Sequence, residues 1–260
     1  NGTLKFGERI DLPGQGWVTK ITLQDFNSDG KLDLAYSSSN SNQLVIHKNT
    51  SVGAQVSFDP ALVFSVASAA PDLIAGDIDD DGKVDLLVAS NGVLAFRNTS
   101  SSSTISFAAP MKFADEGQIV SLISLSDLDG DGKVDLFKAS GAVSVLKNIS
   151  QPGSISFAEA VKYAQPHQPI LGMTADLDED GKPDIITFSE FSSSAVLFSK
   201  SISRPVLSSL SPQSGPQGQT VSLNGFNFGS VTGVSFGGVP ASSFKIESPI
   251  LITAVVGPGE

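Results

Sequence analysis

Four short acidic segments carry the residues of this chain that are best suited to chemistry. They read DFNSDGKLD from Asp25, DIDDDGKVD from Asp77, DLDGDGKVD from Asp127 and DLDEDGKPD from Asp176. All follow the pattern D-x-[DN]-x-D-G-K-x-D, with oxygen-bearing side chains at alternate positions before a glycine. A hard cation such as Ca²⁺ takes roughly six to eight oxygen ligands, and glycine permits the sharp turn that lets them converge. The spacing therefore predicts one calcium loop in each segment.

The predicted ligands of every loop are the side chains at positions 1, 3, 5 and 9 and the backbone carbonyl at position 7. They are Asp25, Asn27, Asp29, Lys31 and Asp33 in the first loop; Asp77, Asp79, Asp81, Lys83 and Asp85 in the second; Asp127, Asp129, Asp131, Lys133 and Asp135 in the third; and Asp176, Asp178, Asp180, Lys182 and Asp184 in the fourth. Without a cation, carboxylates this close would repel one another by on the order of several kcal/mol per loop. Mg²⁺ is less suited, because it demands octahedral geometry and keeps its waters.

The overall charge agrees with this interpretation. The ligand positions hold 15 of the 27 acidic residues, and four bound Ca²⁺ would change the formal net charge from −11 to −3. The acidity is therefore expected to belong to ion sites rather than to a disordered acidic tail. Basic residues are not clustered in a way that would predict binding to nucleic acid.

These loops differ from those of EF-hands. An EF-hand loop ends in a bidentate Glu at position 12, where this chain has Tyr36, Val88, Lys138 and Thr187. The flanking runs, such as VDLLVA and PDIITF, are apolar and β-branched, which favours buried strands. Each loop is thus expected to join two antiparallel strands. A plain Asp-Gly hairpin turn is the alternative for any single copy, but four copies with crowded carboxylates disfavour it.

The loops recur 52, 50 and 49 residues apart, which makes the chain a repeat protein. Other landmarks keep nearly the same period, namely Phe6, Phe58, Phe107 and Phe157, and also Asn49, Asn98 and Asn148. A strand-rich period near 50 residues is typical of propeller blades. In the second unit the four expected strands are roughly DLIAGD, VDLLVA, VLAFRN and ISFAAPMKF.

With these motifs the unit resembles the FG-GAP/VCBS repeat, the calcium-bearing blade of integrin-α-like propellers and of many bacterial surface proteins. The resemblance covers about residues 1–202 and implies an all-β fold of propeller blades with up to four Ca²⁺ as cofactors. The segment that names the family is degraded to FGER, FDPA, FAAP and FAEA, so the VCBS-like branch fits better.

The size of the ring is open at this point. The stretch LKFGERIDL aligns with the fourth strand of a blade and could complete the last repeat of a four-bladed ring. Alternatively, the four repeats belong to a ring of seven or eight blades, which we favour because familiar members of the family have larger rings. The chain, which starts at Asn1, is expected to be a mature or excised piece of a longer protein.

Residues 203–260 differ in composition from the repeats, since they are rich in Gly, Ser and Pro with alternating apolar positions. They resemble an IPT/TIG domain, an immunoglobulin-like β-sandwich. The residues that carry this resemblance are Pro205, Ser211, Pro212, Gly215, Gly218, Gly225, Phe228, Gly229, Val234, Phe236, Gly237, Gly238, Val239 and Ile252. The stretch is short for that family, so we expect the domain to be incomplete.

No catalytic constellation is visible, and the chain is predicted not to be an enzyme. It contains no Cys, no G-x-S-x-G motif, no phosphate loop and no dinucleotide fingerprint. His47 and His167 have no evident nucleophile beside them and are expected to be structural or surface residues. Trp17 and Tyr163 could stack on a sugar, but packing in the core or at the rim is expected for both. The glycosylation-like patterns that start at Asn49, Asn98 and Asn148 recur at one repeat position, so descent of the repeat explains them without a glycan.

The resemblance implies an extracellular or cell-surface module, bacterial in origin, for adhesion or for recognition of a protein or polysaccharide ligand. Two alternatives remain: an accessory or truncated part of a polysaccharide-degrading enzyme, and a structural spacer without a ligand. No apolar run is long enough for a membrane span. Further blades and immunoglobulin-like domains of the same parent chain are the other expected partners.

Overall fold

A computed structural model describes residues 7, 9–12, 16–66, 68–113, 119–163, 169–178, 181–189, 194–197, 205–226, 228–248 and 250–258. Over these residues the protein is all-β, apart from one short 3-10 helix, as the sequence predicts. The strands form five antiparallel sheets of three or four strands and one small two-stranded hairpin. Within these ranges no helix has the length and apolarity needed to cross a membrane.

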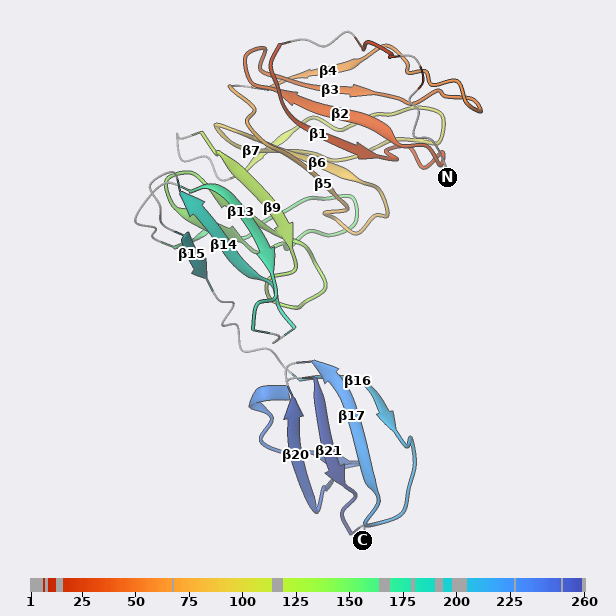
Figure 1. The fold of residues 1–260 in the computed structure, drawn as a ribbon, viewed down its shortest axis with the longest axis vertical. Coiled ribbons are helices and arrows are strands. Elements are labelled where there is room, and N and C mark those ends of the chain that lie inside the picture. The colour runs from red at the N-terminus through yellow and green to blue at the C-terminus, as the bar shows by residue number, and fades with distance from the viewer. Residues whose placement is uncertain are drawn as a thin grey trace, which may run out of the picture.

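Each repeat forms one blade, a sheet whose strands follow one another in chain order (Figure 1). Blade 1 contains β1 (Val18–Gln24), β2 (Asp33–Ser38), β3 (Gln43–His47) and β4 (Leu62–Ser65). Blade 2 contains β5 (Leu73–Gly76), β6 (Asp85–Ser90), β7 (Gly92–Phe96) and β8 (Met111–Phe113). Blade 3 contains β9 (Leu122–Ser126), β10 (Asp135–Ala139), β11 (Val143–Leu146) and β12 (Val161–Tyr163). The described part of blade 4 contains β13 (Pro169–Ala175), β14 (Asp184–Ser189) and β15 (Ser194–Leu197).

The predicted strands of the second unit are confirmed except for the fourth. The segment ISFAAPMKF is a strand only at its end, over β8, and Phe107 forms an isolated bridge with Asn98. Equivalent bridges join Asn49 to Phe58 and Asn148 to Phe157. The periodic Phe and Asn residues therefore face each other at the base of an excursion, which we call the outer hairpin (residues 49–58, 98–107 and 148–157).

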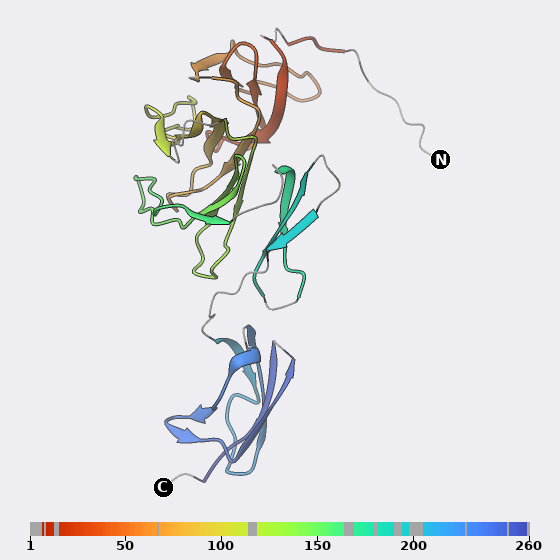
Figure 2. The same ribbon diagram turned by 90° about the vertical axis from the view of Figure 1, so that its left-hand side faces the viewer.

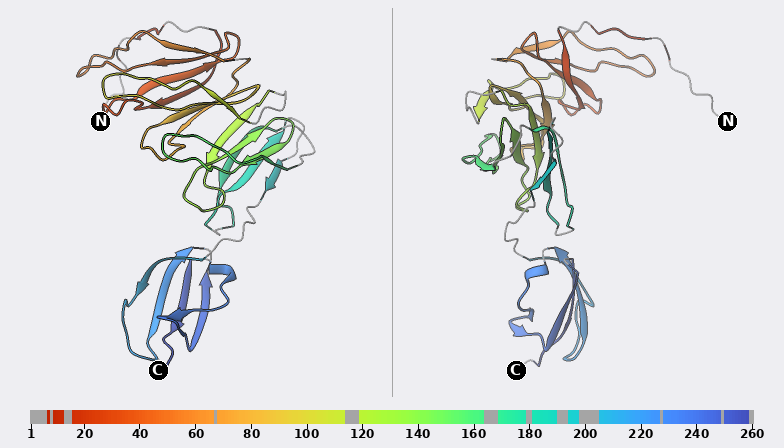
Figure 3. Two further views of the ribbon diagram at one scale, coloured as in Figure 1. Left: turned by 180° about the vertical axis from the view of Figure 1, so that it is seen from behind. Right: turned by 60° about the vertical axis from the view of Figure 1, so that its left-hand side comes forward.

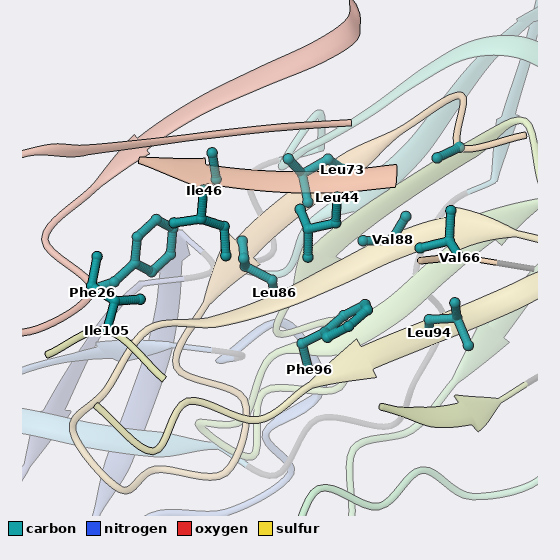
Figure 4. Close-up of a cluster of buried hydrophobic side chains, with 12 residues drawn as sticks. Phe26, Leu44, Ile46, Val66, Leu73, Leu86, Val88, Leu94, Phe96 and Ile105 are labelled. Atoms are coloured by element: carbon teal, nitrogen blue, oxygen red, sulfur yellow. The ribbon is translucent and has the colours of Figure 1, made fainter. Parts of the chain in front are cut away.

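The core lies between the blades rather than within any one sheet. The first cluster of buried side chains joins blades 1 and 2, where Leu44 and Ile46 of β3 lie near Leu86 of β6 (Figure 4). Two further clusters join blade 2 to blade 3 and blade 3 to blade 4. Every residue of β6 and β7 is buried, because a central strand of an inner blade is covered on both faces. This burial explains the continuous apolar runs in the sequence.

The blades stack in chain order, with their first strands β1, β5, β9 and β13 next to one another. Figures 2 and 3 show the same succession from other sides, with the C-terminal sheet beyond blade 4. Within the described residues, no strand of blade 4 pairs with a strand of blade 1. The number of blades in a complete ring therefore stays a prediction.

The C-terminal module is a second all-β unit with its own core. Its main sheet has the order β16 (Val206–Ser211), β17 (Thr220–Phe226), β21 (Leu251–Val255) and β20 (Ser243–Ser248), accompanied by the 3-10 helix Phe228–Ser230 and the hairpin of β18 (Ser235–Phe236) and β19 (Val239–Pro240). Leu223, Phe228 and Ile252 form the centre of its core. A Cβ at Gly225 would lie 2.0 Å from the carbonyl oxygen of Val206, so the pairing of β16 with β17 requires glycine there.

Candidate metal centres

Each acidic loop joins the first strand of its blade to the second, as the sequence predicts. The glycine at position 6 has a positive φ in all four loops, between 83° and 91° at Gly30, Gly82, Gly132 and Gly181. Glycine adopts this left-handed conformation without the steric cost that a Cβ brings. The turn that the motif predicts is therefore present in every copy.

The carboxylate at position 1 shapes the loop from within. Asp25 accepts hydrogen bonds from the backbone N–H groups of Asp29, at 3.0 Å, and Gly30, at 2.7 Å. Asp77 accepts the equivalent bonds from Asp81 and Gly82. Each carboxylate oxygen has further lone pairs, so these bonds orient the group and leave it able to bind a cation.

The carboxylate at position 9 ties the loop to the third strand of the blade. Asp85 is fully buried and accepts hydrogen bonds from the backbone N–H groups of Ile78, at 3.1 Å, and Asn98, at 2.7 Å. The same pair of contacts recurs in blade 1 at Asp33 and in blade 3 at Asp135. An acid at the start of a buried strand is thus held by backbone donors from two sides.

Positions 1, 3 and 9 converge in three of the loops. Ligand-capable oxygens lie within 4.8 Å of one another in the triads Asp77, Asp79 and Asp85; Asp127, Asp129 and Asp135; and Asp176, Asp178 and Asp184. The first loop has Asn27 at position 3, so it places only two carboxylates at these positions. The acids at position 5 are not members of the triads, and Asp180 lies outside the described residues. That position 5 and the carbonyls of Lys31, Lys83, Lys133 and Lys182 complete the shell stays a prediction.

Buried side-chain oxygens at position 3 lack a hydrogen-bond partner in the first two loops. Asp79 is 1% exposed, and neither of its oxygens has a hydrogen-bond partner; the backbone N–H of Gly153 is close enough to lower the pKa of Asp79, but burial outweighs this effect. In the first loop Asn27 Oδ1 is likewise buried and unpartnered. Leaving a buried acceptor unsatisfied costs about 1–3 kcal/mol, and more for a charged group. A cation in the loop would satisfy both, so the residues present fit a divalent ion.

The electrostatics of the loops favour the same ligand. Burial raises the pKa of Asp85 to about 6, against the partial relief from its two backbone donors, and the nearby Asp79 and Asp81 raise it further. Burial likewise raises the pKa of Asp79, and the charge of Asp81 adds to the shift. The pKa values of Asp33 and Asp135 are raised in the same way. Raised pKa values of this kind mark carboxylates that lack a sufficient counter-charge.

In the first three loops, a basic side chain that the sequence analysis did not single out meets the outer part of the loop. Lys48 Nζ lies 3.4 Å from Asp29, and Arg97 lies 3.8 Å from Asp81. In the third loop Lys147 contacts both Asp129 and Asp131. All three basic residues directly precede the periodic asparagine, in HKN, FRN and LKN. The recurrence of a basic residue directly before this asparagine is the sequence pattern from which these partners could have been predicted.

The periodic asparagines themselves join neighbouring blades. Asn98 is fully buried, and its Nδ2 donates to the carbonyl of Phe26 in the loop of the preceding blade and to Val84 in its own, both at 2.8 Å. Asn148 makes the equivalent bonds to Ile78 and Val134, at 2.8 and 2.9 Å. The side-chain amides of Asn98 and Asn148 are thus hydrogen-bonded between blades. This structural role explains why the glycosylation-like pattern recurs at this repeat position.

The remaining candidates show no catalytic geometry. His47 is buried, lies 6.0 Å from the ring of Tyr36 and 6.4 Å from that of Phe58, and has its Nδ1 3.3 Å from the carbonyl of Asp59. The expectation that Trp17 packs in the core or at the rim is wrong, because it is 76% exposed where the chain enters β1. Tyr163 is 42% exposed. His167 lies outside the described residues.

Comparisons with known proteins follow the same division of the chain. The family model of the FG-GAP-like repeat matches residues 25–88, 77–138 and 127–187, each match spanning two successive acidic loops. The model of the IPT/TIG domain matches residues 205–260. No curated protein matches the sequence. Among solved structures, the crystal structure of BBS1N in complex with ARL6DN, soaked with lead, is similar at 14% identity with a TM-score of 0.40. That match covers 81% of this chain and 66% of the other, just under two thirds of its length.

Proposed function

The chain belongs to the FG-GAP-like repeat family, and we propose that it is a calcium-binding recognition module of an extracellular or surface protein. In this proposal every acidic loop takes one Ca²⁺, and the blades present a surface for a protein or polysaccharide ligand. FG-GAP and IPT/TIG domains are typical of such proteins. Membership of this family also favours a role as a module without catalytic activity.

The observation that carries the calcium proposal is the buried carboxylate of Asp79. It lies among the oxygens of its triad without a hydrogen-bond partner, whereas Asp77, Asp81 and Asp85 of the same loop accept hydrogen bonds from backbone N–H groups. Carboxylates and carbonyls are the ligands of hard cations, and Ca²⁺ tolerates irregular geometry better than Mg²⁺ does. When bound, the ion supplies charge neutralisation. The chain's own residues orient the acids and link each loop to the next blade.

Calcium binding is tested by isothermal titration and by thermal unfolding in calcium and in chelator. We expect up to four bound ions and a melting temperature that rises with the calcium concentration, because a ligand of the folded state stabilises it by mass action. An unchanged melting temperature together with no heat of binding would overturn the calcium proposal. It would leave the loops as simple turns.

Recognition is tested on a polysaccharide and matrix-protein array, in millimolar calcium and again with chelator. Calcium-dependent binding to one ligand class is the expected result. Trp17→Ala probes the large exposed ring at the start of β1, and Val206→Ala in the C-terminal sheet is the matched control at an exposed apolar position. Absence of binding by folded, calcium-loaded protein would contradict the recognition proposal and favour a spacer.

A further inference from the structure

The outer hairpins of blades 2 and 3 each lie against the acidic loop of the blade before them. In the hairpin of blade 2, Ile105 is 4% exposed and belongs to the same buried cluster as Phe26, at position 2 of the first loop (Figure 4). In the hairpin of blade 3, Ile155 is 3% exposed and shares a cluster with Ile78, at position 2 of the second loop. Apolar packing therefore holds the turn of each hairpin near the preceding loop.

The first loop meets a carbonyl of the hairpin turn. The Nδ2 of Asn27, at loop position 3, donates to the backbone carbonyl of Ser102 at 2.8 Å and to the carboxylate of Asp29 at 3.1 Å. Because a carbonyl only accepts hydrogen bonds, this contact turns the nitrogen of the amide toward the hairpin. The Oδ1 of the same amide is buried and has no hydrogen-bond partner. The hairpin of blade 2 thereby orients the oxygen that Asn27 can offer to a cation.

The second loop meets an N–H group at the equivalent place. Its position 3 is Asp79, and the backbone N–H of Gly153 is close enough to lower the pKa of this carboxylate, although burial outweighs the effect. Ser102 and Pro152 each stand four residues after the periodic asparagine of their blade. The carbonyl of Ser102 and the N–H of Gly153 therefore belong to the same peptide group of the repeat. An amide faces a carbonyl at one junction, and a carboxylate faces an N–H at the other.

The two hairpin turns differ in conformation at this peptide group. Both are closed by two backbone hydrogen bonds between their first and fourth residues. In blade 3, Gly153 has a φ of 85° and follows Pro152, which is the pattern of a type II turn. In blade 2, neither Ser102 nor Ser103 has a positive φ, which is the pattern of a type I turn. The two types differ by about 150–170° in the dihedral angles on either side of the central peptide, so its carbonyl and N–H exchange directions.

We propose that the turn of an outer hairpin is part of the ion site of the preceding loop, and that its type has to match the residue at loop position 3. A type I turn presents a carbonyl and suits the amide of Asn27, whereas a type II turn presents an N–H and suits the carboxylate of Asp79. An ion held at position 3 would thus also stabilise the junction with the next blade. The matching of turn and side chain rests on geometry, whereas its effect on ion affinity rests on the proposed function.

The test exchanges the turn and the loop residue of the first junction, separately and together, in the full chain. The turn variant carries Ser102→Pro and Ser103→Gly, the pair that blade 3 has at these positions. Asn27→Asp would place a carboxylate against a carbonyl in the unmodified chain and against an N–H in the turn variant. Its effect on calcium affinity is therefore expected to be at least about tenfold more favourable in the turn variant. Titration calorimetry measures this effect, because the other three loops are intact in every variant.

The turn variant alone is expected to weaken calcium binding at the first loop. An N–H would then meet the Nδ2 of Asn27, which favours rotation of the amide and turns its nitrogen toward the ion. Adding Asn27→Asp is expected to restore the affinity, since a carboxylate can accept from the N–H and still offer its second oxygen. A rescue of this kind would not follow from a merely structural role of the turn. Equal changes in calcium affinity in the two backgrounds would overturn the role of the turn in the ion site.

Urea unfolding in chelator tests the matching without an ion. Asn27→Asp is expected to lower the urea midpoint by less in the turn variant than in the unmodified chain, and equal shifts would overturn the matching. Both serines are exposed, so the turn variant is expected to fold, which circular dichroism verifies. A protein that binds no calcium would overturn the proposed function, and the urea comparison would still decide the matching.

The second junction supplies the reciprocal exchange and the matched control. With Pro152→Ser and Gly153→Ser in the turn, Asp79→Asn is expected to raise the urea midpoint in chelator by more than it does in the unmodified chain. The control combines the same serine turn with Asn27→Asp, which belongs to the other junction, and these effects are expected to add. Additive effects within each junction, or equal coupling within and across the junctions, would overturn the proposal.

Discussion

The side-chain amide of Asn98 donates to the backbone carbonyl of Phe26, which lies 2.8 Å away and 72 residues earlier in the chain. The same amide donates to the carbonyl of Val84 in its own blade, so one buried side chain holds two acidic loops. Its Oδ1 accepts the N–H of Ser100 at the base of the outer hairpin. A single asparagine therefore links a loop, a hairpin and the junction between two blades.

Asn98→Ala is expected to destabilise the protein by about 2–4 kcal/mol, because it leaves two buried carbonyls without donors. Asn49→Ala is the matched control: Asn49 is only half buried, and its Nδ2 donates to Leu32 within its own blade. We expect a cost of about 1 kcal/mol there. Urea unfolding of both variants measures the difference, and equal losses would show that the contact between blades contributes nothing of its own.

Asp79→Asn is expected to change stability in opposite directions with and without calcium. Without the ion, removing an unpartnered buried charge should stabilise the fold by about 1–3 kcal/mol. With calcium, loss of a charged ligand should weaken one site at least about tenfold. Asp80→Asn is the control, since Asp80 is exposed, lies between ligand positions and has a φ of 56°, which Asn tolerates. Equal stabilisation of Asp79→Asn in both conditions would rule this carboxylate out as a ligand.

Lys147→Met is expected to raise the calcium affinity of the third loop several-fold. The ammonium group contacts both Asp129 and Asp131, so it competes with a cation for the same carboxylates. These hydrogen bonds raise the pKa of Lys147, which keeps the competitor charged. Lys245→Met, which removes an exposed ion pair with Glu247 in the C-terminal sheet, is the control. Titration calorimetry that shows unchanged or weaker binding for Lys147→Met would contradict the competition.

Stability should depend on pH in opposite senses with and without calcium. The pKa of Asp85 is raised to about 6 in the folded protein, above its ordinary value of 3.8. Without calcium, the folded state therefore binds this proton more tightly than the unfolded chain does. The resulting stability is present below pH 4 and is lost as the pH rises through 6, by on the order of 1–3 kcal/mol. With saturating calcium the ligands must be ionised, so stability should fall as the pH is lowered.

Urea unfolding at pH 5 and pH 7, in calcium-depleted and in calcium-saturated buffer, measures both slopes. Asp85→Asn should reduce the calcium-free dependence, of which the raised pKa values of Asp79, Asp33 and Asp135 keep a part, whereas Asp80→Asn should leave it in place. A calcium-free protein that is more stable at pH 7 than at pH 5 would contradict the raised pKa.

Much of the fold was predictable because its information is local and repeated. In each of the four loops, the motif specifies a turn at the glycine of position 6, which has a positive φ. The apolar runs on either side of the loop specify buried strands. The period of about 50 residues specifies blades, since each loop and its strands recur with the same spacing. The family and the two-part division of the chain follow from the same local patterns.

The contacts between repeats were not predictable in this way. Nothing local distinguishes Asn98, which holds two blades together, from Asn49, which binds only within its own blade. Likewise, Val56 and Ile105 occupy equivalent places in the repeat, yet one is half exposed and the other buried. Their difference comes from whether another blade precedes theirs in the described fold.

The sequence by itself thus determined the loops, the strands and the candidate ligands, because backbone turns and alternating oxygens depend on neighbours along the chain. Only the tertiary structure decided that the acids at position 5 lie outside the triads and meet basic side chains in the first three loops. It also decided which apolar side chains of the described fold are exposed. Burial and the contacts between blades depend on segments some 50 to 75 residues apart, whose approach is set by the packing of whole sheets against one another.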